Sequence, residues 1–379
     1  MKKILLRYGE LTLKGKNRIN FIKVLENNLK KKMEGEVVVT FDRAFISYSE
    51  NNVNQLQYIF GLSSYSIVEE IDTTWDNIVN CVLEEAKQFK FNSFRIQTKR
   101  SDKNFIFSSQ ETNEKLGGVI LKKFENSYVQ LKDSDLTIYV EIRAKKSFVF
   151  SNYVYTRGGM PVGISGKTLH LMSGGIDSPV AANLMQKRGL VVDFINFITP
   201  PHTDFFTTQK VEELITQITK YQLKSTLFQI NYTKIMNYLT LVSNQKYKIT
   251  LMRRSFYRIA DAIAKKFHYS ALSNGENLAQ VASQTLESIN VIQEVTNLPI
   301  FRPLVSFDKN DTIKIAEQIN TYEISIRRAC ETCELFAPKE PVTKPNLQEA
   351  LKLEEELPRL KELEAEAIEN VTIYHFTNK

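Results

Sequence analysis

The stretch that decides the fold is Thr168-Leu-His-Leu-Met-Ser-Gly-Gly-Ile-Asp-Ser-Pro-Val-Ala-Ala182. An apolar run over residues 169–172 predicts a buried strand, and the spacing after Val180 predicts a helix. The turn Ser173-Gly-Gly175 lies between them. A strand, a glycine turn and a helix in this order can bind an anion, because the start of a helix offers unpaired N–H groups and a partial positive charge. We expect both glycines to turn the backbone with positive φ, and the hydroxyls of Ser173 and Ser178 to donate to a phosphate.

The same turn excludes two common phosphate loops. No lysine follows Gly175, so the loop is not a Walker A motif, and the glycine spacing does not fit Gly-x-Gly-x-x-Gly. The string Ser-Gly-Gly-Ile-Asp-Ser instead resembles the PP-loop of ATP pyrophosphatases. These enzymes cleave ATP between the α and β phosphates and transfer AMP.

Length and composition set the class of protein. A chain of 379 residues with 42% hydrophobic residues predicts two or three domains. No stretch of about 18 apolar residues occurs, so we expect no membrane span and no membrane partner. The three cysteines, Cys81, Cys330 and Cys333, are too few for a disulfide scaffold and predict a cytoplasmic protein with reduced thiols. Cys81 shares a helical face with Ile78 and Val82 and is expected in the core.

The charge is unevenly distributed along a chain of net charge +7. Residues 1–33 hold ten Lys/Arg and two acidic residues, whereas residues 347–379 hold eight Glu and four Lys/Arg. The basic front predicts a polyanion partner, and nucleic acid is favoured over the alternative of a solvated helix face. The acidic end predicts helices that pack on the body or on a second subunit.

The chain divides into four parts. Residues 1–55 alternate strands and a helix as a small α+β unit, and residues 56–155 form a second unit with basic and aromatic residues interleaved. Residues 156–345 alternate strand and helix, which predicts a doubly wound parallel sheet with ligands past the carboxyl ends of its strands. Residues 346–379 are the acidic helical tail. The fold class is thus α/β multidomain.

Basic residues in the first two parts are candidate RNA contacts, mainly to phosphates. A plain surface loop or a core position is the alternative for each. The candidates are Arg7, Lys14, Lys16, Arg18, Arg95, Lys99, Arg100, Lys103 and Arg143.

Three further strings identify a family. They are Arg7-Tyr-Gly-Glu-Leu-Thr-Leu-Lys-Gly15, Leu251-Met-Arg-Arg-Ser-Phe-Tyr-Arg-Ile-Ala260 and Asn274-Gly-Glu-Asn-Leu-Ala-Gln-Val-Ala-Ser-Gln-Thr-Leu286. With the PP-loop they resemble the tRNA 4-thiouridine synthetase family, also known from thiamine thiazole synthesis, in a short form without a rhodanese domain. The resemblance implies a ferredoxin-like domain (1–55), a THUMP RNA-binding domain (56–155) and a PP-loop domain (156–345).

The resemblance also implies an activity and its site. ATP with Mg²⁺ would adenylate uridine 8 of a tRNA bound near its acceptor stem, and persulfide sulfur would then displace AMP. Asp177 would bind Mg²⁺ or support the α-phosphate. Asn196 and Asn274-Gly-Glu-Asn277 depart from the histidine and the Thr-Gly-Glu-Ser that the family often shows. The implied ATP contacts are Leu171, Met172, Ser173, Gly174, Gly175, Asp177, Ser178, Asn196, Phe197, Arg253, Gly275 and Gln284.

The cysteine pair completes the implied site. The family places a catalytic cysteine before a Phe-x-Pro string, which points to Cys333, and Arg327 and Arg328 would lower the pKa of its thiol. Cys330 would resolve the persulfide by forming a disulfide with Cys333, or would be incidental. Inert thiols and half of a zinc site are the structural alternatives.

The implied partners are tRNA, a cysteine desulfurase as sulfur donor, a sulfur-carrier protein if thiazole synthesis is also served, and a second copy in a homodimer. Two alternatives to this function remain open. One is a PP-loop enzyme that delivers a different nucleophile, and the other is a tRNA-binding protein with a vestigial nucleotide site.

Overall fold

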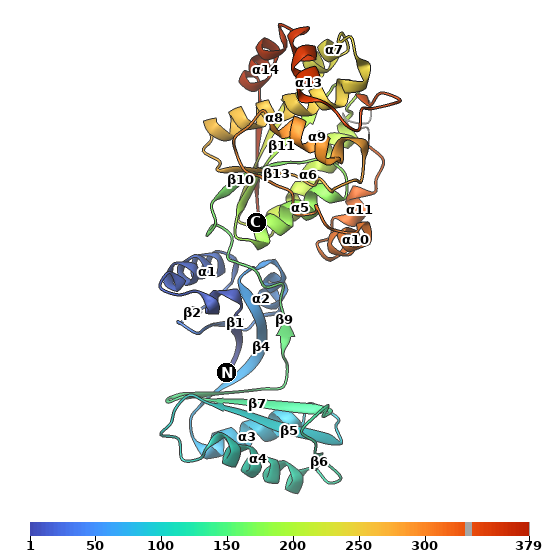
Figure 1. Cartoon of the computed structure of the whole chain (residues 1–379). Helices are drawn as coiled ribbons and strands as arrows, with labels where there is room; N and C mark the ends of the chain where they lie inside the picture. The colour runs from blue at the N-terminus through green and yellow to red at the C-terminus, as the bar shows by residue number, and fades with distance from the viewer. Residues whose placement is uncertain (330–335, 379) are drawn as a thin grey trace. The chain divides into compact units, whose positions relative to one another are not determined.

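The computed structural model describes residues 1–329 and 336–378, which form two compact units, Met1–Gly159 and Met160–Lys379. Each unit is built on one sheet (Figure 1). No helix in the described residues is both long and apolar enough to cross a bilayer.

The first unit holds a nine-stranded sheet of order β2-β3-β1-β4-β8-β7-β5-β6, with β9 paired to β4. Its strands are β1 (Lys2–Tyr8), β2 (Val37–Val39), β3 (Arg43–Ser47), β4 (Leu62–Asp72), β5 (Ser93–Arg100), β6 (Tyr128–Val129), β7 (Leu136–Ile142), β8 (Lys146–Phe150) and β9 (Val154–Tyr155). The long strand β4 pairs with β1 along residues 62–69 and with β8 along residues 69–72. It therefore joins the two halves of the unit.

Helices cover this sheet as the hydrophobic spacing predicts. The helices are α1 (Arg18–Lys32), α2 (Glu50–Gln55), α3 (Trp75–Ala86) and α4 (Ser109–Lys123). The Thr74 hydroxyl caps α3, and Ser108 forms a capping box with Glu111 at the start of α4. Cys81 packs against the core of this half, and burial raises the pKa of its thiol to about 12.

The second unit has a six-stranded sheet of order β14-β13-β10-β11-β12-β15. Its strands are β10 (Lys167–Leu171), β11 (Val191–Ile198), β12 (Lys224–Asn231), β13 (Ala271–Ser273), β14 (Ile300–Phe301) and β15 (Thr372–Thr377). Its helices are α5 (Asp177–Lys187), α6 (Phe205–Thr219), α7 (Thr233–Leu239), α8 (Lys248–Lys266), α9 (Leu286–Gln293), α10 (Lys309–Gln318), α11 (Tyr322–Ser325), α13 (Leu347–Glu355) and α14 (Leu360–Glu369).

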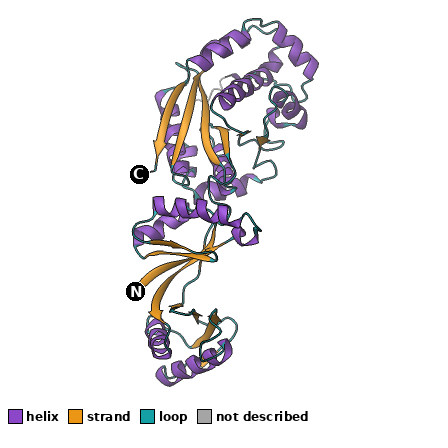
Figure 2. Ribbon diagram, turned by 90° about the vertical axis from the view of Figure 1, so that its left-hand side faces the viewer, coloured by secondary structure: helices purple, strands orange, loops and turns teal. Residues whose placement is uncertain are grey.

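Helices lie on both faces of this sheet (Figure 2). One face contributes Leu169, Ile195 and Phe228 to a core shared with α7, α8, α9, α13 and α14. The opposite face meets α5 and α6, since successive side chains of a strand point to opposite sides. All neighbouring strands from β14 to β12 run parallel, which confirms the predicted doubly wound fold.

The acidic tail packs on the body of its own chain. Glu354 pairs with Arg254 and Arg258 of α8, and Glu364 pairs with Arg258. The negative charge of residues 347–379 is therefore partly neutralised within the unit. The tail is not helical throughout, because β15 adds to the sheet edge antiparallel to β12. Helical spacing of leucines ends before this strand, and its Thr-Ile-Tyr-His-Phe-Thr sequence favours β-structure.

Candidate active site

The turn after β10 is closed by serine hydroxyls. The Ser178 hydroxyl accepts a hydrogen bond from the Ser173 N–H (3.1 Å) and donates one to the Ser173 carbonyl (2.9 Å). The Gly175 N–H donates to the Ser173 hydroxyl (3.3 Å). The expectation of positive φ at both glycines was wrong, because neither Gly174 nor Gly175 is among the residues with positive φ. These side-chain bonds, rather than left-handed glycines, hold the turn.

A buried histidine ties this turn to two strands. The Nε2 atom of His170 on β10 lies 2.9 Å from the Ser178 carbonyl, and its Nδ1 atom lies 2.9 Å from the Ser273 hydroxyl at the end of β13. A carbonyl only accepts, so Nε2 carries the proton and Nδ1 accepts from Ser273. Burial lowers the pKa of His170 to about 3, and the ring is neutral at physiological pH.

Gly275 follows β13 and lies directly against the start of α5. A Cβ atom at this position would be 2.8 Å from the carbonyl carbon of Asp177 and 2.8 Å from the Ser178 nitrogen. Both neighbours are backbone atoms, which cannot rotate away. Gly275 was predicted as an ATP contact, and in the structure its backbone packs closely on the loop itself.

A cavity of about 300 Å³ opens at the carboxyl ends of β10, β11 and β13. It brings together eleven of the twelve predicted ATP contacts from distant parts of the sequence, and Gly175 alone is not in its wall. The lining residues among those predicted are Leu171, Met172, Ser173, Gly174, Asp177, Ser178, Asn196, Phe197, Arg253, Gly275 and Gln284.

One end of the cavity combines an aromatic wall with an open acceptor. Phe197 of β11 stacks on Phe256 of α8 with ring centroids 3.9 Å apart. The amide of Asn196 donates to the Met172 carbonyl (2.9 Å), while its buried Oδ1 atom has no hydrogen-bond partner among the residues that the structure describes. A buried acceptor of this kind suits a donor on a bound base.

Arg253 of α8 also lines the cavity and is held in an ion pair. Its guanidinium pairs with Glu276 and donates to the Ser283 hydroxyl (3.0 Å). Arg253 was predicted as an ATP contact, but its pairing with Glu276 was not, since no pattern in the sequence links positions 253 and 276.

Asp177 begins α5 and is engaged on both oxygens. Lys309, the first residue of α10, lies 2.6 Å from its Oδ1 atom, and Gln280 donates to its Oδ2 atom (2.9 Å). Lys309 is 132 positions away in sequence and was not predicted. Within the described parts of the chain, no three His, Cys, Asp or Glu side chains gather in a way that could hold a metal.

The cavity is also lined by residues that were not among the predicted ATP contacts. Several of them lie in α6. Because α6 begins shortly after β11, the carboxyl end of that strand could have pointed to these residues. The further lining residues are Ile195, Ile198, Thr203, Thr207, Thr208, Val211, Ile249, Phe256, Asn274, Glu276, Val281 and Ser283.

The predicted cysteines Cys330 and Cys333 lie outside the described residues. The segment before them starts beside the loop, since the Ser325 hydroxyl donates to the Gly175 carbonyl (3.4 Å). Lys210 of α6 donates to the Arg327 carbonyl (2.7 Å), and the Arg327 guanidinium pairs with Glu213 (2.6 Å). Its charge is therefore partly compensated.

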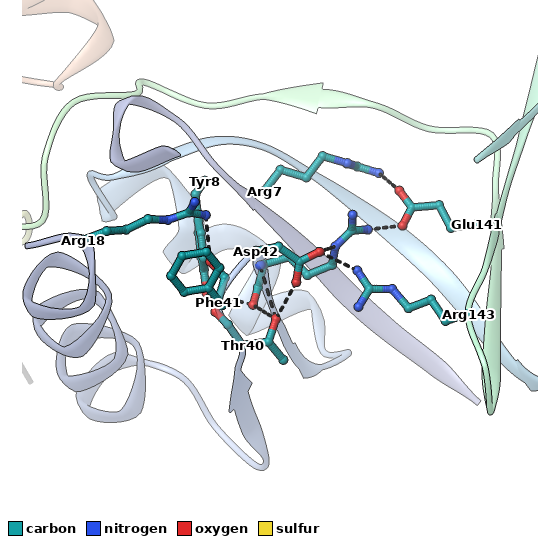
Figure 3. Close-up of polar contacts among 9 residues, drawn as sticks. Arg7, Tyr8, Arg18, Thr40, Phe41, Asp42, Glu141 and Arg143 are labelled. Atoms are coloured by element: carbon teal, nitrogen blue, oxygen red, sulfur yellow. Dashed lines mark hydrogen bonds and ion pairs between the residues drawn. The ribbon is translucent and has the colours of Figure 1, made fainter. Parts of the chain in front are cut away.

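In the first unit, three of the candidate RNA contacts serve the fold (Figure 3). Arg7 is 15% exposed, donates to the Ser66 hydroxyl (2.9 Å) and lies over the ring of Tyr153. Arg143 pairs with Asp42 (2.8 Å). Arg18 donates to the Phe41 carbonyl (2.7 Å) and lies over its ring at 4.1 Å.

These contacts belong to a charge cluster that joins the halves of the first unit (Figure 3). Buried Arg43 pairs with buried Glu141 of β7, and also with Asp42 (3.1 Å). Burial raises the pKa of Asp42, but the Thr40 hydroxyl and the charges of Arg143 and Arg43 lower it further, to about 2. The carboxylate is therefore charged at neutral pH.

The other candidates differ in how many contacts their side chains make within the protein. Arg95 donates to Thr137 and Leu131, and Arg100 donates to the carbonyls of Phe105 and Phe107. Lys14 lies over the ring of Phe21. The exposed candidates are Lys16, Lys99 and Lys103.

We predict that Gly275→Ala destabilises the second unit by about 2 kcal/mol, because the new methyl group would press on backbone atoms of the loop. Thermal unfolding of the variant would show this. Gly118→Ala in α4 is the matched control, since nothing lies within 4 Å of a Cβ there and alanine favours a helix. An unchanged melting temperature for Gly275→Ala would contradict the close contact.

Comparison with known families matches nearly the whole chain. The model described as Thiamine biosynthesis protein (ThiI) matches residues 163–358, the ThiI ferredoxin-like domain matches residues 3–66, and the THUMP domain matches residues 68–152. A probable tRNA sulfurtransferase of Metamycoplasma arthritidis is 58% identical over 98% of both chains. One of Mycoplasmopsis agalactiae is 51% identical over 99% of both chains.

A solved structure is similar over the same length. It is a 4-thiouridine synthetase in complex with RNA and with bound ATP, it is 34% identical, and it superposes with a TM-score of 0.93 over 99% of this chain and 100% of that chain. Sequence, domain order and fold agree. The chain therefore belongs to the ThiI family of tRNA sulfurtransferases.

Proposed function

We propose that the chain binds ATP in the cavity of the second unit and uses it to convert uridine 8 of tRNA into 4-thiouridine. The observation that carries this proposal is the convergence of four separate segments, including residues 171–178 and 274–284, on one cavity at the strand ends. The similar solved structure, a 4-thiouridine synthetase with RNA and bound ATP, supports it.

The chemistry of the walls orients the nucleotide. Adenine fits the end formed by Phe197 and Asn196, where an aromatic ring and an unpaired acceptor are available. The phosphates fit the turn at residues 173–178, because the start of α5 is positive. Arg253 and Lys309 supply positive charge to the site, since Arg253 lines the same cavity and Lys309 pairs with Asp177 at the start of α5.

Asp177 is suited to act as one ligand of a magnesium ion. Nucleotide sites hold Mg²⁺ through one or two carboxylates together with phosphates and water, and Asp177 is the one carboxylate of the loop at residues 173–178. Its oxygens face Lys309 and Gln280, whose side chains are flexible. Bound Mg²⁺ would neutralise phosphate charge.

The first step we propose is adenylation. The O4 atom of the uridine attacks the α-phosphate, a bond from O4 to phosphorus forms, and pyrophosphate leaves with the electrons of the broken P–O bond. Lys309 would stabilise the charge that develops on the phosphates, since Asp177 holds its ammonium group beside the loop.

The second step we propose transfers sulfur. A persulfide on Cys333 attacks C4 of the uridine, and AMP leaves with the electrons of the C4–O bond. The Cys330 thiolate then attacks the Cys333 sulfur of the mixed disulfide, which releases 4-thiouridine and leaves a Cys330–Cys333 disulfide. A dithiol reductant returns both cysteines to thiols, so that electrons balance.

Several partners follow from these steps. The first unit would hold the tRNA acceptor stem, with exposed Lys16, Lys99 and Lys103 as phosphate contacts. A cysteine desulfurase in the cytosol would charge Cys333. We also propose a sulfur-carrier protein as a partner in thiazole synthesis, and the assembly of two copies of the chain into a homodimer.

We predict that Lys309→Met lowers the rate of tRNA-dependent AMP formation about 100-fold, because it removes a positive charge beside the phosphates. The rate is measured with tRNA transcript, Mg-ATP and persulfide donor. Lys314→Met is the matched control on the same helix, since Lys314 pairs only with exposed Asp311 (3.2 Å) among its described contacts. A Lys309→Met rate within threefold of the wild-type rate would exclude this role.

We predict that Cys333→Ala abolishes 4-thiouridine formation, read by its near-ultraviolet absorbance, while tRNA-dependent release of pyrophosphate still occurs. Cys81→Ala is the matched control, because the thiol of Cys81 is held protonated in the core. Loss of thiolation in Cys330→Ala as well would support the two-thiol cycle. Thiolation that survives in Cys333→Ala would contradict the sulfur route through Cys333. AMP release without thiolation in the wild type would favour a different nucleophile, and no AMP release by the wild type would favour a vestigial nucleotide site.

A further inference from the structure

A buried carboxylate in the cavity wall has no role in the steps above. Glu276 lies two residues past Asn274, at the carboxyl end of β13, and is 4% exposed. A charged group buried to this degree needs partners, because its removal from water costs several kcal/mol. The partners of Glu276 indicate what it does.

Both oxygens of Glu276 are occupied by cations. Arg253 of α8 pairs with Oε1, and Arg302 donates to Oε2 (2.6 Å). The hydroxyl of buried Tyr257 also donates to Oε2 (3.4 Å). Burial raises the pKa of Glu276, but the charges of Arg253 and Arg302 lower it further, so the group is a carboxylate at neutral pH.

The backbone of Glu276 is fixed as firmly as its side chain. The Asn274 side chain accepts from the Glu276 N–H (3.0 Å) and donates to the Tyr257 hydroxyl. The preceding Gly275 packs against the start of α5. The carboxylate is therefore held in a constant position relative to the PP-loop.

Arg253 is consequently oriented from two sides. Its Nη2 atom pairs with Glu276, and its Nη1 atom donates to Ser283 (3.0 Å), which also lines the cavity. A guanidinium held in this way loses little further conformational entropy when it meets an anion. Two guanidiniums and one carboxylate also leave one net positive charge, so the cluster still attracts phosphate.

We propose that Glu276 is a positioning residue that sets the guanidinium of Arg253 against the phosphates of bound ATP. The inference rests on the proposed binding of ATP in this cavity. Glu276 does not contact the nucleotide in this account, since both of its oxygens are taken by arginine. Glu276 acts through Arg253, so the effect of its substitution on ATP binding should depend on the presence of Arg253. A residue that only stabilises the fold would show no such dependence.

The test is a double-mutant cycle on the dissociation constant for Mg-ATP, measured by calorimetry on the full chain. Glu276→Gln removes the charge with little change of shape, and Arg253→Gln removes the guanidinium. We expect each single variant to weaken ATP binding about tenfold. In the Arg253→Gln background, we expect Glu276→Gln to change the dissociation constant by less than about twofold.

A matched control is Arg302→Gln, which takes away the other cation that Glu276 holds. It leaves the pair with Arg253 in place, so ATP binding should stay within about threefold of the wild type. Should Glu276→Gln fail to fold, as judged by its melting temperature, Ser283→Ala replaces it in the same cycle, with about threefold weaker binding expected in the wild-type background alone.

Two results would overturn the inference. One is a full tenfold effect of Glu276→Gln in both backgrounds, which would mean that it does not act through Arg253. The other is a loss in Arg302→Gln as large as that in Glu276→Gln, which would mean that the cluster as a whole supports the wall. Unchanged binding in Arg253→Gln would also contradict the inference, because Arg253 would then not meet the phosphates. If the wild type does not bind ATP, the proposed function fails instead.

Discussion

The start of α5 and the turn after β13 approach so closely that only glycine fits at position 275. A Cβ atom there would lie 2.8 Å from two backbone atoms, and the contact joins the PP-loop to the segment at residues 274–284. His170 supports the same junction from within the sheet, since it bonds to Ser178 on α5 and to Ser273 on β13. Backbone contact and a neutral buried imidazole together set the floor of the cavity.

The walls depend on this floor in different ways. Glu276 follows Gly275 directly and pairs with Arg253 on α8, so the ion pair fixes Arg253 relative to the junction. Asp177 begins α5, and it brings Lys309 of α10 to the mouth of the loop. Charge is thus arranged around the cavity by pairs whose members come from different elements. Such prearranged charge is the usual source of stabilisation for a reaction that moves phosphate.

Much of this was predictable from sequence, for a physical reason. Buried strands, glycine turns and helix starts leave local patterns, so the strand at 169–172, the helix after it and the parallel sheet were confirmed. The strand ends then gathered most of the predicted ATP contacts, because parallel strands end at one edge. The φ angles of Gly174 and Gly175 were wrong, since the Ser178 hydroxyl closes the turn.

Pairing between distant residues was not predictable. Lys309 and Glu276 have no local pattern that links them to Asp177 or Arg253. Arg7 is a basic residue of the kind that contacts RNA, yet its side-chain contacts with Ser66 and Glu141 place it in the cluster that joins the halves of the first unit. The strand β15 was not predicted, because the six uncharged residues after the helix show no hydrophobic periodicity that would distinguish an edge strand from an irregular chain end.

We expect ATP to lie in this cavity with its phosphates on the turn after β10. A crystal structure with α,β-methylene-ATP, which resists cleavage at the reacting bond, would test this arrangement. We predict the phosphates at the N–H groups of residues 173–178 and adenine beside Asn196 and Phe197. Phosphates located away from this turn, or adenine placed against Arg253, would contradict it.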